Sequence, residues 1–298
     1  MSVTENIRVA APRPLVVLEL LKPVTWFPPM WAYLCGVVST GLPIWDNWAL
    51  FALGIILAGP VVCGMSQAAN DWCDRHVDAI NQPDRPIPSG RMPGRTGLWV
   101  ALLMTALGLA IGWQLGPWGF AATLVATALA WAYSAEPLRL KRSGIWGPGT
   151  VGLAYEGLPW ITGAAVMTAA LPRWETLAIA LLYALGAHGI MTLNDFKALE
   201  GDRATGVNSL PVTLGPRRAA RVACWVMALP QGAVVALLAS WGATAPALAI
   251  GGLLGLQAVA MRRLLTDPEG LAPWYNGTGV MLYVTGMLIA AFALGALS

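Results

Sequence analysis

The chain has 298 residues, of which 57% are hydrophobic and 11% are charged, and its formal net charge is +3. Water-soluble domains carry roughly 25% charged residues, so the composition excludes a water-soluble globule and indicates an integral membrane protein. The small positive charge does not indicate a nucleic-acid partner.

Nine apolar stretches predict an all-α, polytopic membrane protein with nine transmembrane helices around a central cavity. Each stretch is close to the roughly 20 residues that a helix needs to cross a bilayer. Gly and Pro interrupt several of them, which membrane helices tolerate when their neighbours satisfy the freed backbone groups. The stretches cover residues 22–41, 48–69, 96–115, 117–134, 148–170, 174–194, 218–241, 244–264 and 275–297.

The basic residues predict the orientation. With nine crossings, 17 of the 18 Lys and Arg residues fall on one side of the membrane, and only Arg173 falls on the other. Because basic residues stay cytoplasmic, we expect a cytoplasmic N-terminus, a C-terminus on the opposite side and cytoplasmic connecting loops.

The sequence NDWCDRHVD, residues 70–78, follows the second apolar stretch. Its carboxylates Asp71, Asp74 and Asp78 have the i, i+3, i+7 spacing of one helical face. Like charges repel at this spacing, so a positive partner is expected between them. Oxygen ligands favour a hard ion such as Mg²⁺ shared with phosphate oxygens. A solvated acidic helix end is the simpler alternative, but this helix continues from a membrane crossing.

A second acidic segment, NDFKALEGDR at residues 194–203, follows the sixth apolar stretch. Both segments begin with Asn-Asp and continue to an Asp-Arg pair. This similarity predicts one domain over residues 1–298, with repeated halves of about 22–134 and 148–264 and a ninth helix at 275–297. Seven of the 15 acidic residues lie between Asp71 and Asp84 or in the second segment, too many for solvation alone. We expect the two segments to face each other.

Facing acidic segments with nearby cations suit a diphosphate, because metal ions bridge carboxylates to phosphate oxygens while Lys and Arg neutralise the remaining charge. Departure of diphosphate from an allylic lipid needs this arrangement, since charge builds on the leaving group. An apolar cavity would hold the isoprenoid chain and shield the carbocation from water. A cation-coupled transporter is the alternative from another class. Transporters place ionisable groups near the middle of the membrane, whereas these segments lie at helix ends.

The pattern NDxxDxxxD after the second stretch, together with EGDR after the sixth, resembles the UbiA-type intramembrane prenyltransferases. Within that family, residues 70–91, 133–149, 155–160 and 188–212 are similar to the chlorophyll and bacteriochlorophyll synthases, and so are residues 22–39. The resemblance implies Mg²⁺-dependent esterification of the 17-propionate of bacteriochlorophyllide a with geranylgeranyl or phytyl diphosphate. Plant-type chlorophyllide, a quinone precursor and haem are the alternative acceptors.

The resemblance also implies a place in the bacterial cytoplasmic membrane, with a periplasmic C-terminus, and association with other pigment-biosynthesis or photosynthetic membrane proteins. It implies roles for individual residues. The metal ligands are Asn70, Asp71, Asp74, Asp78, Asp195, Glu200 and Asp202. The catalytic carboxylates among them are Asp71, Asp74, Asp195 and Asp202.

Cations near these segments are the expected diphosphate ligands. Lys141 and Arg142 match the basic loop of the family, and Arg75 and Arg203 are expected to assist them. Three further residues are candidates for substrate binding, with packing between helices as the alternative for His188 and Glu156: His188, Glu156 and Tyr155. Residues 79–95 are expected to form a lid over the diphosphate, or else a plain linker.

Overall fold

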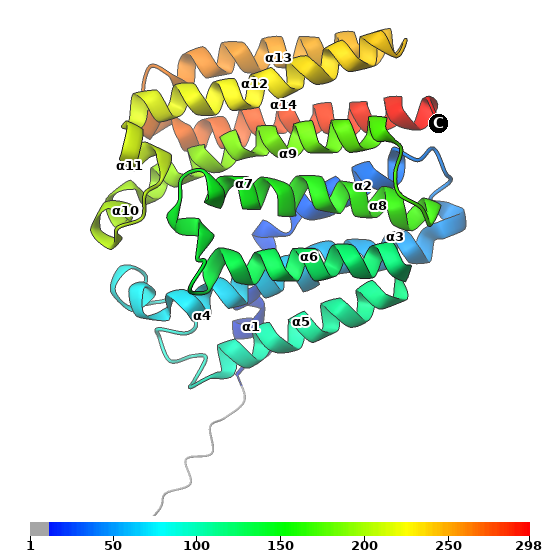
Figure 1. Ribbon diagram of the computed structural model, residues 1–298. Helices are drawn as coiled ribbons and strands as arrows, with labels where there is room; N and C mark the ends of the chain where they lie inside the picture. The colour runs from blue at the N-terminus through cyan, green and yellow to red at the C-terminus, as the bar shows by residue number, and fades with distance from the viewer. Residues whose placement is uncertain (1–11) are drawn as a thin grey trace, which may run out of the picture.

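The computed structural model describes residues 12–298, and within that range the chain is built from helices. Figure 1 shows the long helices lying side by side, with short turns at one end of the bundle and longer connecting segments at the other. In the described residues, β pairing is limited to one isolated bridge between Ser143 and Asn208. The predicted all-α fold is therefore confirmed.

The first half of the bundle contains two short helices and three long helical passes. It comprises α1 (Pro14–Leu21), α2 (Phe27–Val38), a continuous helix of α3 (Trp48–Ile56), η3 (Leu57–Cys63) and α4 (Gly64–Asn81), then α5 (Thr96–Gln114) and α6 (Gly116–Ser134).

The second half begins with a helix that is again interrupted by a π-helical segment. It comprises α7 (Trp146–Gly152), η5 (Leu153–Gly157), α8 (Leu158–Thr168), α9 (Trp174–Asn194), η6 (Asp195–Ala198), α10 (Leu199–Thr205), α11 (Leu210–Leu214), α12 (Pro216–Ser240), α13 (Thr244–Leu264) and α14 (Pro268–Ala296).

Six helices within residues 12–298 are long and apolar enough to cross a membrane. They are Trp45–Asn81, Thr96–Gln114, Trp174–Thr205, Pro216–Ser240, Thr244–Leu264 and Pro268–Ala296. The chain is thus a multi-pass protein by helix length and composition. The other predicted stretches coincide with α2, with α6 and with the α7–α8 pass, but these do not meet the same criterion. Nine crossings therefore stay a prediction.

Two π-helical segments interrupt the long helices, each next to a proline. Pro60 lies inside η3, and Pro159 follows η5 by two residues. Proline has no backbone N–H and its ring clashes with the preceding turn, so the helix around it widens locally. Such widened turns occur often at functional sites. Here they change which side chains face the interior of the bundle.

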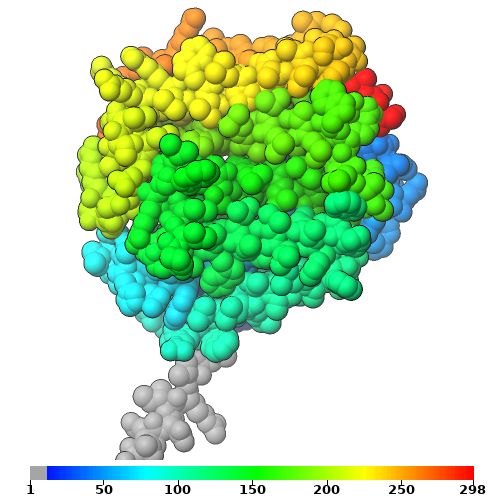
Figure 2. Space-filling model, viewed as in Figure 1, coloured from blue at the N-terminus to red at the C-terminus, as the bar shows by residue number. Residues whose placement is uncertain are grey.

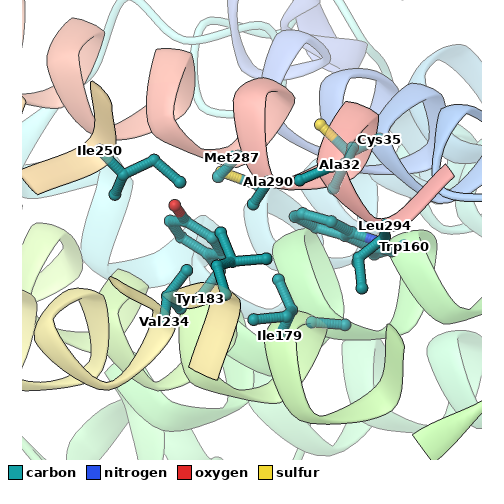
Figure 3. Packing of buried hydrophobic residues seen from close by; sticks show 14 of the residues in the cluster. Ala32, Cys35, Trp160, Ile179, Tyr183, Val234, Ile250, Met287, Ala290 and Leu294 are labelled. Carbon is teal, nitrogen blue, oxygen red and sulfur yellow. The ribbon is translucent and has the colours of Figure 1, made fainter. Parts of the chain in front are cut away.

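Close backbone contact joins α2 to α8. A Cβ atom at Gly36 would lie 2.0 Å from the carbonyl oxygen of Trp160, and one at Gly163 would lie 2.4 Å from that of Tyr33. Small residues allow this approach between membrane helices. Figure 3 shows Trp160 and Tyr183 in the adjoining apolar core, where their rings stack with centroids 5.7 Å apart. This contact fixes α8 and therefore the η5 segment before it.

The two acidic segments end two long helices at the same end of the bundle. Figure 1 shows the carboxyl end of α4 and the carboxyl end of α9, with α10 and α11, at the end that carries the longer connections. Figure 2 shows that side chains fill the spaces between the ribbons on this face of the molecule. The described part of the fold therefore places both segments where a shared site can form.

Candidate active site

A polar cavity of about 950 Å³ lies between the two acidic segments. From the first segment it is lined by Asn70, Asp74 and Asp78, and from the second by Asp195, Glu200 and Asp202. The segments therefore face one another across a common hollow, as the sequence analysis expects. The roles of the individual side chains stay predictions, since geometry alone does not assign them.

An apolar cavity of about 530 Å³ adjoins the polar one and extends between the helices. Asn70 and Asp195 line both cavities and so stand at their boundary. The walls of the apolar cavity come mainly from α2, η3, α6, η5, α9 and α14. A molecule with a charged head and a hydrocarbon chain fits this pair of cavities, with its head between the acidic segments.

Asp74 and Asn70 hold the basic connection that follows α6. Arg139 donates to Asp74 Oδ1 at 2.8 Å, and Lys141 Nζ pairs with Asp74 Oδ2. Lys141 also donates to Asn70 Oδ1 at 2.9 Å, and Ser134 donates to the same oxygen at 3.3 Å. Burial lowers the pKa of Lys141, and the neighbouring Asp74 carboxylate opposes that shift. Two cations are thus held beside the polar cavity.

Asp71 has a different environment from Asp74. It is 1% exposed, pairs with Lys22 at 2.7 Å and Arg85 at 3.2 Å, and is not among the residues that line either cavity. Arg85 also pairs with Asp78 at 2.7 Å. Around the helix axis, side chains seven residues apart point in directions that differ by about 20°, and side chains three residues apart differ by about 60°. Asp71 and Asp78 therefore lie on the same side of α4, and Asp74 lies further round the helix. The structure therefore places Asp71 apart from the lining of the polar cavity, and its role as a metal ligand stays a prediction.

The carboxylates of the second segment lack such counter-ions. Asp195 begins η6, and Glu200 and Asp202 lie on α10. In the part of the chain that the structure describes, no ion pair joins any of the three to Lys or Arg. One wall of the polar cavity therefore carries carboxylates paired with cations, and the other wall carries carboxylates without an ion pair in the described residues.

The donor set fits Mg²⁺ held jointly with a phosphate group. Every candidate ligand is an oxygen atom, as this ion prefers. Among residues 12–298 no cluster of three or more acidic, His or Cys side chains is close enough to form a complete metal cage. Mg²⁺ is usually bound by one or two carboxylates together with substrate phosphates and water. Separated carboxylates on facing walls match that mode of binding.

The other predicted phosphate ligands divide into two groups. Arg142 and Arg203 line the polar cavity, and Arg142 also pairs with Glu136 at 2.9 Å. Arg75 lines neither of the two cavities; it stacks on Trp72 at 4.3 Å and donates to the Trp72 carbonyl. The structure therefore does not bring Arg75 to the site, because its guanidinium binds within its own helix.

Three cations that the sequence analysis did not select contact the acidic residues: Lys22, Arg85 and Arg139. Arg139 belongs to the same basic run as Lys141, which is a signal that the sequence offered. No local pattern identifies Lys22 or Arg85, because their pairing with Asp71 depends on the fold.

Two of the three candidates for substrate binding line the apolar cavity, and the third does not. Tyr155 and Glu156 line the apolar cavity from η5, and Glu156 is 5% exposed. His188 lies on α9 with its Nδ1 3.5 Å from Thr192 Oγ1, and it lines neither cavity. The alternative for His188, packing between helices, matches this position.

Comparison with known proteins agrees with the arrangement. The chain is 65% identical over 285 residues to the bacteriochlorophyll synthase 33 kDa chain of Cereibacter sphaeroides, covering 96% of this chain and 94% of the relative. It is 37% identical to the chloroplastic chlorophyll synthase of Oryza sativa subsp. japonica, covering 93% of this chain and 76% of that one.

The fold is also that of a solved UbiA homologue from Archaeoglobus fulgidus bound to GPP and Mg²⁺. The two superpose with a TM-score of 0.63 at 20% identity, over 95% of this chain and 97% of that one. The UbiA prenyltransferase family matches residues 25–276 of the sequence. On these grounds, the chain belongs to the UbiA prenyltransferase family.

Proposed function

We propose that this prenyltransferase is a bacteriochlorophyll synthase. It esterifies the 17-propionate of bacteriochlorophyllide a with geranylgeranyl or phytyl diphosphate and releases diphosphate. One observation carries the proposal: two acidic segments face a polar cavity that adjoins an apolar one. The high identity to a bacteriochlorophyll synthase over nearly the whole chain supports this acceptor.

The first task of the site is to hold the diphosphate at the mouth of the apolar cavity. Asn70, Asp74 and Asp78 on one wall would hold Mg²⁺ together with Asp195, Glu200 and Asp202 on the other. The bound ion supplies charge neutralisation for the leaving diphosphate. This assignment is supported by the oxygen donors and by the carboxylates of the second wall, which form no ion pair in the described residues.

The basic residues bind the phosphate oxygens directly. Lys141 and Arg139 are already positioned at the polar cavity by Asp74, and Arg85, Arg142 and Arg203 also line it. When a diphosphate enters, Lys141 and Arg139 exchange the Asp74 carboxylate for phosphate oxygens. Charge-assisted hydrogen bonds of this kind are stronger than neutral ones, and they stabilise the charge that develops as the carbon–oxygen bond breaks.

The second task is to keep water away from the allylic carbon while the acceptor approaches. The isoprenoid chain occupies the apolar cavity, so the carbon from which diphosphate departs lies near Asn70 and Asp195. A propionate of the acceptor is ionised at neutral pH, so it attacks that carbon without a general base. The new ester bond forms as the bond to diphosphate breaks.

We also propose nine membrane crossings. The six long apolar helices are complemented by α2, by α6 and by the α7–α8 pass. The charge bias supports a cytoplasmic N-terminus and a periplasmic C-terminus in the bacterial inner membrane, with repeated halves over about 22–134 and 148–264. Association with other pigment-biosynthesis or photosynthetic membrane proteins belongs to the same proposal, and copurification from membranes tests it.

The decisive experiment supplies the purified protein with Mg²⁺, geranylgeranyl diphosphate and one acceptor at a time. The acceptors are bacteriochlorophyllide a, chlorophyllide a, haem and 4-hydroxybenzoate, and a parallel reaction contains a chelator in place of Mg²⁺. We expect a prenyl ester from bacteriochlorophyllide a only while Mg²⁺ is present. Product from 4-hydroxybenzoate, with none from bacteriochlorophyllide a, would overturn the proposed acceptor.

A further inference from the structure

Glu156 is a buried carboxyl group in the wall of the apolar cavity. It is 5% exposed, it lies on η5, and within residues 12–298 its Oε2 has no hydrogen-bond partner. None of the ion pairs within residues 12–298 includes it. An unsatisfied buried polar group costs about 1–3 kcal/mol, and ionisable groups inside the membrane mark functional sites by default. A bound molecule is the natural source of the missing partner.

Four polar side chains line the same cavity as Glu156. Gln67 Nε2 donates to the hydroxyl of Tyr155 at 3.0 Å, and Cys63 Sγ lies 3.3 Å from the same oxygen. Thr25 Oγ1 lies 3.4 Å from Cys63 Sγ. All four residues line the apolar cavity. These four groups form a polar strip and satisfy one another, whereas Glu156, in the same lining, keeps an oxygen without a hydrogen bond within residues 12–298.

Much of the remaining lining of the cavity is apolar. Ala122, Ala126, Leu129 and Ala130 of α6 contribute to it. A hydrocarbon chain packs against such residues without leaving a polar atom unsatisfied. A prenyl chain has no hydrogen-bonding atom to offer Glu156, so the α6 wall is the better surface for it. The polar strip is then available to the acceptor.

The acceptor of the proposed reaction carries the complementary group. Bacteriochlorophyllide a has ketone oxygens at the rim of its conjugated ring, whereas haem and 4-hydroxybenzoate have no ketone. Burial without a neighbouring cation favours the protonated acid over the carboxylate, and a protonated acid has an O–H to donate. We propose that Glu156 donates a hydrogen bond to a ring ketone of the acceptor and thereby determines acceptor specificity. This inference rests on the proposed function.

Steady-state kinetics with two acceptors test the inference. The enzyme is compared with Glu156→Gln, which keeps a hydrogen-bond donor, and with Glu156→Leu, which keeps none. Each protein receives bacteriochlorophyllide and the same pigment with its ketones reduced to methylene groups, which cannot accept a hydrogen bond. We expect Glu156→Leu to raise the KM for the ketone pigment about tenfold, as loss of one buried hydrogen bond implies, while Glu156→Gln raises it less. The KM for prenyl diphosphate should change less than about twofold.

A matched control is Glu175→Gln. Glu175 lies in the first turn of α9 and pairs with Arg173 at 3.0 Å, and it lines neither cavity. The KM of this variant for the pigment should equal that of the unmodified protein. The preference for the ketone pigment over the reduced one should disappear in Glu156→Leu. An unchanged preference, or a loss confined to prenyl diphosphate, would overturn the inference while leaving the proposed function intact. A protein that esterifies neither pigment but prenylates another acceptor would overturn both.

Two physical readouts separate substrate binding from a structural role. Resonance Raman spectra of the bound pigment should show the ketone stretch at a lower frequency in the unmodified protein than in Glu156→Leu, because a donated hydrogen bond weakens the carbonyl bond. Thermal unfolding should show Glu156→Leu at least as stable as the unmodified protein, since an apolar side chain replaces an unsatisfied polar one. Identical ketone frequencies, or a clearly less stable Leu variant, would contradict the inference.

Discussion

Asp74→Asn replaces the carboxylate that binds two cations at the polar cavity with an uncharged amide of the same shape. In the structure Arg139 donates to this carboxylate at 2.8 Å, and Lys141 pairs with its other oxygen. The substitution therefore removes a proposed metal ligand and at the same time frees both cations. These two consequences have opposite effects on phosphate binding, which makes the variant informative.

The expected magnitudes follow from burial. The Arg139 and Lys141 side chains are 18% and 14% exposed, so their ion pairs with Asp74 are partly buried. Disruption of a fully buried pair costs about 3–5 kcal/mol, and a surface pair is worth about 0–1 kcal/mol. We expect Asp74→Asn to destabilise the protein by about 2 kcal/mol. Turnover should fall at least about 10³-fold, or about 4 kcal/mol, because the charge developing on the leaving group is less well stabilised.

Binding of inorganic diphosphate should change in the other direction when Mg²⁺ is absent. With the competing carboxylate removed, Lys141 and Arg139 are available to the ligand, and its affinity should rise about fivefold, equivalent to about 1 kcal/mol. The assays are prenyl-ester formation, thermal unfolding followed by Trp fluorescence, and calorimetric titration with diphosphate plus chelator. Asp84→Asn is the matched control, since Asp84 is exposed and lines neither cavity. Turnover above about a tenth of the original value, with its Mg²⁺ dependence retained, would refute the reasoning.

Three further predictions concern the opposite wall, the basic connection and the helix contact. Asp202→Asn removes a carboxylate without a counter-ion, so the Mg²⁺ concentration for half-maximal activity should rise at least about tenfold; an unchanged Mg²⁺ titration would contradict its role. Lys141 is charged below its pKa, and burial lowers that pKa, so diphosphate binding should weaken at a lower pH than for a solvated lysine. In Lys141→Arg, the KM for prenyl diphosphate should begin to rise at a higher pH, because arginine stays charged. Superimposable pH profiles of the two proteins would argue against this. Gly36→Ala places a Cβ 2.0 Å from the Trp160 carbonyl oxygen and should lower stability by about 1–3 kcal/mol, whereas an unaltered unfolding midpoint would show that the contact is dispensable.

Much of the architecture was predictable because membrane helices depend on local composition. The apolar stretches coincide with observed helices, since each crossing must satisfy its own backbone hydrogen bonds. The meeting of Asp74 with Asp202 at one cavity followed from the repeated Asn-Asp pattern at two helix ends.

The remainder depends on tertiary contacts that spacing does not encode. Asp71 has the same residue type and helical context as Asp74, yet Lys22 and Arg85 neutralise it away from the cavity. Spacing placed it within the motif, but only the packing of α1 and of residues 82–95 against α4 determines its partners.

The most direct test of the central claim is a structure of the protein in a lipid nanodisc with Mg²⁺ and a non-reactive analogue of geranylgeranyl diphosphate. The account predicts that the diphosphate lies in the polar cavity, bridged by metal to Asp74 on α4 and to Asp202 on α10, with its chain in the apolar cavity. A diphosphate bound outside that hollow, or held by only one of the two acidic segments, would contradict it.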